Sequence, residues 1–317
     1  MRGGWGIILV SLALLSVLVV SVALLRDKEE EEAPESLSLL AEITLSFERL
    51  PPRARGHYEL WERRPSGGEQ RLGTFRVLEG GSLVTLTGDP LITLPLAELP
   101  PSGTEILLTI EAGDTPSERR SERVLLHGTL GTTEADLTPR FPKIPKGQVA
   151  LLATPTKEGA PGSAGVWFAK KGDKKGSPSP GLSIPRLPEG WVYGGWVVTG
   201  AGTTLPTGLF PDPWKADEHT FYGGSEPGWD LPGEDFLRDA PEGVKFPPNL
   251  ADGRTQLLVS MEPDFDGAEE HGEPFLPLLT TRIPYKQAVN TPFPLGPVEE
   301  RTFPQGRLVI APRSVTP

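Results

Sequence analysis

The sequence contains no cysteine, and only two methionines and two asparagines occur among its 317 residues. The absence of cysteine excludes disulfides, thiolate zinc sites and a lipid-modified cysteine, and it leaves the redox compartment undetermined. Scarce thermolabile side chains and abundant proline are compatible with a thermophilic source. A basic surface is missing too, because the formal net charge is -11 and the pI is about 5.0. We therefore expect no nucleic-acid partner, since a phosphate backbone needs a basic face.

The motifs of common enzymes are also absent. No GxSxG elbow, P-loop or dinucleotide glycine fingerprint occurs. Four histidines are present, and none has metal-ligand spacing: His57, His127, His219 and His271. Pairs such as Glu234 and Asp235 could act as acid and base, but loop carboxylates are ordinarily only solvated. We expect a protein that is not an enzyme, with no catalytic residue, cofactor or metal.

Glycine and proline, at 37 and 36 residues, are too frequent for long helices and favour an all-β chain. From Ala41 onward, apolar and polar residues alternate with the period of two that half-buried strands require. Six or seven short strands with turns between them fill roughly 95 residues, which is the profile of a β-sandwich. The same succession recurs once, so we predict two tandem β-sandwich (immunoglobulin-like) domains.

One long apolar run stands out, from Trp5 to Leu25, and its 21 residues carry no charge. This length is enough to cross about 30 Å of hydrocarbon as a helix. A cleaved signal peptide is the alternative, with Ser21 to Ala23 as small residues at a cleavage site, but the run exceeds the usual apolar core of such peptides. We predict a single-pass anchor with residues 1–4 in the cytoplasm and the chain after Leu25 outside.

The two units are marked by matching aromatic residues and glycines. Tyr58, Trp61, Gly73 and Phe75 recur with identical spacing as a second set about 135 positions later: Tyr193, Trp196, Gly208 and Phe210. A strand ending in glutamate also occurs twice, at Glu111 and Glu262, about 151 positions apart. We expect the tryptophans to be buried equivalents that fill the core between sheets.

The difference between these offsets predicts an insertion of roughly 16 residues in the second copy, within the loop 211–240. Its aromatic residues do not alternate, so they cannot all be strand residues of a core. Its carboxylates are ligands of the kind that Ca²⁺ prefers, yet their spacing matches no EF-hand. One interpretation is an Ω-like loop packed by its own aromatics; the other is a binding loop. The candidate ligand or partner residues are Trp214, Phe221, Tyr222, Trp229, Asp230, Glu234 and Asp235.

These observations predict the following order of parts. An acidic linker at 26–37 follows the anchor at 5–25, and the two sandwiches occupy 38–131 and 148–285. A Pro-rich connection at 132–147 joins the sandwiches, and a Pro-rich tail at 286–317 follows them. Within this tail only Arg307 to Ala311 has the composition of a strand, and the pattern leaves open whether it forms one.

Leu50 to Gly128 contains a Leu-Pro, a Tyr-x-Leu-Trp, a Gly-x-Phe, a strand ending in Glu and a closing Val-Leu-x-Gly. With these five motifs the first unit resembles the extracytoplasmic C-terminal domain of anti-sigma-K factors. The second unit looks like an elaborated relative of that domain. Members of the family carry a cytoplasmic sigma-binding domain, whereas only Met1 to Gly4 precede the apolar run here. The resemblance therefore implies an outer, regulatory half that does not bind a sigma factor by itself.

Two functions remain open at this point. The first is a membrane-anchored extracytoplasmic interaction or regulatory module with a protein partner in the cell envelope. The second is an extracytoplasmic module that binds a glycan, a cell-wall fragment or Ca²⁺.

Overall fold

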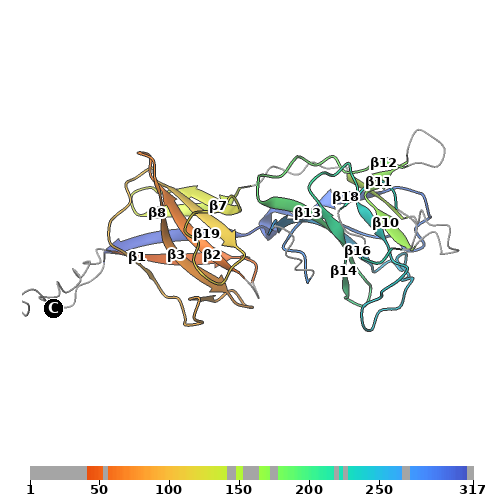
Figure 1. Cartoon of the computed structure of the whole chain (residues 1–317), viewed down its shortest axis with the longest axis horizontal. Helices are drawn as coiled ribbons and strands as arrows, with labels where there is room; N and C mark the ends of the chain where they lie inside the picture. The colour runs from red at the N-terminus through yellow and green to blue at the C-terminus, as the bar shows by residue number, and fades with distance from the viewer. Residues whose placement is uncertain are drawn as a thin grey trace, which may run out of the picture. The chain divides into compact units, whose positions relative to one another are not determined.

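The computed structural model describes residues 41–52, 56–140, 148–152, 164–171, 178–217, 221–223, 228–265 and 272–312. These residues form nineteen strands and one 3-10 turn, η1 (Glu300–Thr302), so the described chain is all-β as predicted (Figure 1). None of the helical structure found there is long and apolar enough to span a membrane. The predicted span from Trp5 to Leu25 and the acidic linker lie outside the described residues.

Two large antiparallel sheets carry nearly all of the described strands. The first sheet has the order β4-β3-β2-β6-β7-β8-β19-β1-β5. Its strands are β1 (Ala41–Glu48), β2 (His57–Arg63), β3 (Glu69–Val77), β4 (Leu83–Val84), β5 (Leu94–Leu96), β6 (Glu105–Glu111), β7 (Val124–Thr129), β8 (Glu134–Pro139) and β19 (Gln305–Pro312).

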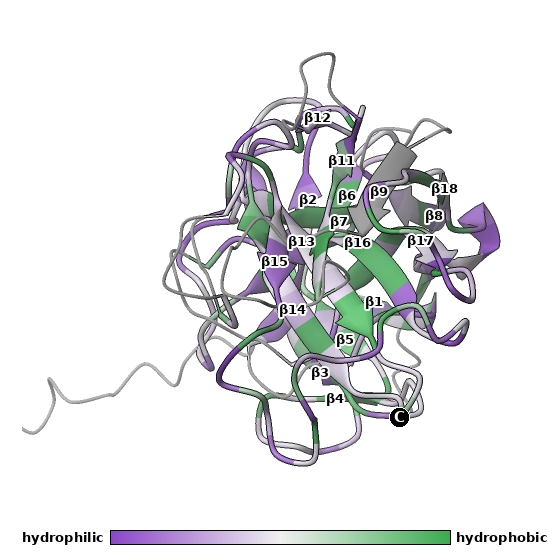
Figure 2. Cartoon of the chain, turned by 90° about the vertical axis from the view of Figure 1, so that its right-hand side faces the viewer, coloured by the Kyte–Doolittle hydropathy of each residue, from purple (hydrophilic) through white to green (hydrophobic). Residues whose placement is uncertain are grey.

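The second sheet has the order β14-β13-β16-β17-β18-β9-β10-β15. Its strands are β9 (Gln148–Leu152), β10 (Gly165–Trp167), β13 (Trp191–Val198), β14 (Thr204–Phe210), β15 (Gly233–Asp235), β16 (Gln256–Pro263), β17 (Leu276–Arg282) and β18 (Phe293–Pro297). A two-stranded sheet of β11 (Ala169–Lys170) and β12 (Ser179–Pro180) completes the described strands. Figure 2 colours β16 largely as hydrophobic and β15 as hydrophilic.

The first sheet curls around its apolar face. The ring of Phe47 in β1 stacks on the ring of Phe75 in β3 with centroids 5.5 Å apart, although β1 and β3 are far apart in the strand order. Gly73 of β3 lies so close to Leu94 of β5 that a Cβ at this position would be 2.5 Å from the leucine methyl groups. Strands from opposite ends of the sheet therefore meet across the core, and a side chain at position 73 would displace Leu94.

The repeated residues occupy matching places in the strand pairing. Tyr58 pairs with Phe75 across β2 and β3, and Tyr193 pairs with Phe210 across β13 and β14. The rings stack in the same way, with centroids 5.7 Å apart in both pairs and interplanar angles of 24° and 23°. Each tyrosine hydroxyl donates to the carbonyl of a proline seven or eight residues upstream. The repeated residues thus build the same local core twice.

The tryptophans of the repeat are buried, but they do not lie in the core between sheets as the sequence suggested. Trp61 packs with Leu107 in a separate small cluster, and its Nε1 donates to Glu59 at 3.0 Å. Trp196 is 1% exposed and donates to Ser260 at 2.7 Å. A tyrosine and a tryptophan three positions apart in a strand point to opposite faces, so only the tyrosines face the core.

The two large sheets match strand for strand, apart from the extra β4. In the orders given above, β3-β2-β6-β7-β8 corresponds to β14-β13-β16-β17-β18, and β19-β1-β5 corresponds to β9-β10-β15. The strand between β8 and β1 comes from the end of the second unit, and the strand between β18 and β10 follows the first unit in the sequence. The two units therefore exchange one equivalent strand each.

The exchanged strands also resemble each other in sequence. Gly147 to Leu152 reads GQVALL and Gly306 to Ala311 reads GRLVIA, and a Phe-Pro pair precedes each of them. The sequence prediction divided these regions differently. The predicted connection at 132–147 contains β8, and the predicted tail at 286–317 contains β18, η1 and β19. Proline caused both errors, because a Pro-rich segment is typical of a connection or tail. Strands β8, β18 and β19 nevertheless carry prolines, at positions where the sheet tolerates them.

Candidate functional site

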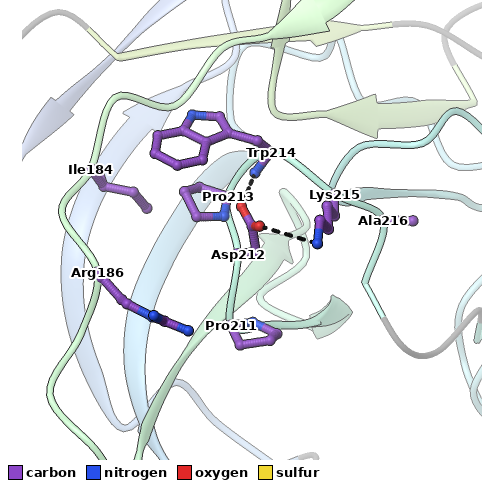
Figure 3. A pocket seen from close by; sticks show the side chains of 8 residues that line it. All are labelled: Ile184, Arg186, Pro211, Asp212, Pro213, Trp214, Lys215 and Ala216. Atoms are coloured by element: carbon purple, nitrogen blue, oxygen red, sulfur yellow. Dashed lines mark hydrogen bonds and ion pairs between the residues drawn. The ribbon is translucent and has the colours of Figure 1, made fainter.

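A cleft of about 480 Å³ lies at the start of the predicted binding loop. One wall comes from the segment before β13 and the other from residues 211–216, directly after β14 (Figure 3). These segments meet because β13 and β14 form a hairpin, so the start of the first strand and the end of the second lie at the same end. The lining residues are Ile184, Arg186, Pro211, Asp212, Pro213, Trp214, Lys215 and Ala216.

Trp214 is the dominant side chain of the cleft, and it is 57% exposed. Its Nε1 donates to the carbonyl of Leu182 at 3.3 Å, and its backbone N–H donates to Asp212 Oδ1 at 2.9 Å. The second bond closes an Asx turn, which the Pro-Asp-Pro sequence favours. The indole is therefore held in one orientation while much of its surface stays open to solvent.

Charged side chains of both signs line the same cleft as the indole. Lys215 Nζ lies 3.8 Å from Asp212 Oδ2, and the lysine side chain is largely exposed. Arg186 extends from the opposite wall, below Ile184 in the view of Figure 3. The cleft thus offers an apolar face next to two cations and one carboxylate, which is the composition of many sites for polar ligands.

Most of the other predicted site residues pack within the protein. The Tyr222 ring lies 5.6 Å from the ring of Phe236 and 5.2 Å from that of Phe246, and Phe236 is fully buried. Phe221 lies 6.0 Å from Tyr222. Trp229 makes an edge contact of 5.3 Å with Trp167. Phe221, Tyr222 and Phe236 thus pack on one another within the loop, whereas Phe246 and Trp167 contact it from outside.

The predicted acidic residues are likewise engaged in holding the loop. Trp167 Nε1 donates to Asp235 at 3.4 Å, and the N–H of Ala216 donates to the exposed Asp230 at 3.4 Å. Glu234 is 2% exposed and accepts the N–H of Phe221 at 2.6 Å. Among the described residues, no three acidic or histidine side chains are grouped so that they could hold a metal ion.

Asp217 and Glu234 form the most perturbed pair of carboxyls in the loop. Burial raises the pKa of Asp217 to about 8, and the nearby charge of Glu234 adds to this effect. Burial also raises the pKa of Glu234 to about 7, against the hydrogen bonds that its carboxylate accepts. The N–H of Gly233 donates to Asp217 at 3.2 Å, so the pair joins the loop to β15. Protonated carboxyls are favoured here because the site is poorly solvated.

Of the seven predicted residues, only Trp214 lines the cleft. Sequence reasoning missed Ile184 and Arg186, which lie some thirty residues before Trp214 in a Pro-rich segment. They lie opposite Pro211 because β13 pairs with β14. The repeated Tyr193 and Phe210 could have indicated this pairing. No protein-family model, curated protein or solved structure matches this chain.

Proposed function

We propose that this protein is a non-enzymatic, membrane-anchored binding protein of the cell envelope, with its ligand cleft at Trp214. The uncharged run from Trp5 to Leu25 supports the anchor, with the β-rich chain on the extracytoplasmic side. The two matching sheets support a tandem arrangement of β-sandwich units. The resemblance of Leu50 to Gly128 to the outer domain of anti-sigma-K factors supports an envelope location.

The exposed and oriented indole of Trp214 is the observation that carries the proposal. Exposed tryptophan offers a large rigid face on which a sugar ring can stack, while its neighbours supply hydrogen bonds. Arg186, Lys215 and Asp212 line the same cleft and match the hydroxyl and acidic groups of a polysaccharide. We therefore propose a glycan of the cell wall as the ligand.

A protein partner in the envelope is the second candidate. Tryptophan and arginine are the residues that most often dominate protein interfaces, and Trp214 and Arg186 stand together in this cleft. The two candidates share the site and differ in the ligand.

The decisive variant is Trp214→Ala, tested for sedimentation with purified cell-wall polymer. We expect binding to fall by about tenfold or more, because stacking on one aromatic side chain contributes on the order of 1–2 kcal/mol. Thermal stability should stay near that of the wild type, since the side chain is largely exposed. Tyr285→Ala is the matched control, because Tyr285 is an aromatic residue that is 69% exposed and outside the cleft.

If Trp214→Ala binds the cell-wall polymer as well as Tyr285→Ala does, the cleft is not the binding site. If the wild type binds no cell-wall polymer but captures an envelope protein through Trp214, the ligand is a protein and the glycan proposal is wrong.

A further inference from the structure

The first sheet depends on a strand that the chain supplies only after the whole second unit. All eight residues of β19 pair with β1, and four of them pair with β8. Leu308 and Ile310 of β19 are buried in the apolar core. Without β19, β8 and β1 would have no common neighbour, and the core would lose two of its apolar side chains.

The segment that leads into β19 is short and largely exposed. It begins where the N–H of Val298 donates to Leu278 of β17 at 2.9 Å. The turn η1 follows, closed by the bond from the N–H of Thr302 to the carbonyl of Glu299 at 2.9 Å. Arg49 Nε then donates to the carbonyl of Phe303 at 3.1 Å. If this single turn straightened, β19 would leave the first sheet while β18 stayed in the second sheet.

The slot between β8 and β1 is matched to the sequence of β19. Ile310 lies opposite Ile43 and Leu308 lies opposite Leu45, so apolar residues face each other on one side of the sheet. On the exposed side, Arg307 forms an ion pair with Glu134. A second copy of this chain carries the same strand, with the same apolar and charged positions.

We propose that β19 is an exchangeable strand and that the partner it fits is a second copy of this chain. In the resulting dimer, each β19 lies between β8 and β1 of the other copy. Every strand contact of the closed chain is retained, so the exchange changes little apart from the association entropy and the hinge conformation. The two units of one chain already exchange equivalent strands, and short hinge loops favour this kind of assembly.

The absence of cysteine permits a direct test with two single-cysteine variants of the full chain. Ser46 and Arg307 are both exposed and lie directly opposite each other in β1 and β19. Ser46→Cys and Arg307→Cys chains with different tags are co-expressed, extracted in detergent and oxidised. We expect a covalent dimer that contains both tags and is lost on reduction, because directly opposite residues in a sheet are close enough for a disulfide.

The control pair is Arg63→Cys with Glu69→Cys, which are opposite each other in the local hairpin of β2 and β3. These two chains should give no covalent dimer, because a hairpin of adjacent strands closes within its own chain. A chain with both Ser46→Cys and Arg307→Cys shows whether the first pair can form a bond at all. If the double variant forms its internal disulfide and the mixed single variants form no dimer, β19 is not exchanged and the proposal is wrong.

Discussion

At the scale of single residues, the face of the first sheet opposite the core is held by buried polar side chains. His57 Nδ1 faces the carbonyl of Gly113 at 2.6 Å and its Nε2 faces Glu59 Oε1 at 3.1 Å. Burial lowers the pKa of His57, but the bonds to Glu59 and Gly113 outweigh this effect and raise it. Glu59 also accepts the N–H of Ser117 at 2.6 Å. The imidazolium, which donates from both nitrogens, is the form that satisfies this network.

The glutamates that end equivalent strands have a structural role on the same face. Glu111 accepts the hydroxyl of Thr109 at 2.9 Å. Glu262 accepts the hydroxyl of Ser260 and, at 2.9 Å, the N–H of Phe275. The repeated Glu of the sequence pattern therefore anchors neighbouring side chains and backbone, and it needs no catalytic explanation.

Truncation of either repeated tryptophan should destabilise the protein strongly. Trp61→Ala and Trp196→Ala are each expected to lower the free energy of unfolding by about 3–5 kcal/mol, because each removes a buried indole and with it the hydrogen bond that the indole donates to Glu59 Oε2 or to Ser260. Chemical denaturation monitored by circular dichroism measures the change. A loss below about 1 kcal/mol, the typical effect of an average substitution, would contradict this packing.

Asp217→Asn should change how stability depends on pH. Because the pKa of Asp217 is raised in the folded state, its contribution is complete below the usual value of 3.8 and is lost as the pH rises through about 8. Asparagine keeps an acceptor for the N–H of Gly233 and cannot ionise. We expect the variant to gain stability relative to the wild type between pH 5 and pH 9, measured by denaturation at each pH. Parallel profiles for the two proteins would show that Asp217 does not titrate in this range.

At the scale of elements, the sequence predicted those features that depend on residues close together in the chain. The alternation at Ala41 to Phe47, the repeated hairpins and the packed aromatics of the loop were all visible in the sequence and are confirmed. Strand β15, Gly233 to Asp235, was missed because it has only three residues, two of them acidic, and its burial depends on pairing with β10 and on contacts with residues distant in the sequence. Strand exchange was missed because the pattern of a strand does not indicate which sheet it joins.

The position of β15 also changes how the loop should be tested. A short Gly/Ser connection in place of residues 211–240 would not test the cleft alone. The segment contains β15 and the fully buried Phe236, so its removal would unfold the second unit. The single change at Trp214 avoids this problem because it affects only the cleft.

Removal of the last strand should unfold the first unit. A chain that ends at Pro304 lacks β19, so β1 loses its pairing along all eight residues and the core loses Leu308 and Ile310. We expect the amides of β2 and β6 to lose their protection from hydrogen exchange, measured by mass spectrometry. A synthetic peptide with the β19 sequence should restore that protection. Full protection in the shortened chain without peptide would show that β19 is dispensable.

At the scale of the whole molecule, the two units of one chain exchange β9 and β19, so each unit is complete only when the other is folded. The chain from residue 40 onward accordingly forms one compact unit. Two tandem domains that each contained all of their own strands could unfold one after the other. In this chain, unfolding of either unit releases a strand that the other unit needs, since β9 and β19 cross in opposite directions.

Unfolding should therefore be a single cooperative transition. For the closed single chain we expect a calorimetric enthalpy equal to the van't Hoff enthalpy, as in a two-state protein, despite the two sheets. Hydrogen exchange in β2 and in β13 should be lost at the same denaturant concentration. Leu308→Asp places an unpaired charge in the core of the first sheet, so it should lower both midpoints together, although β13 belongs to the second sheet. If only the β2 midpoint falls, the units are energetically independent and the exchanged strands do not couple them.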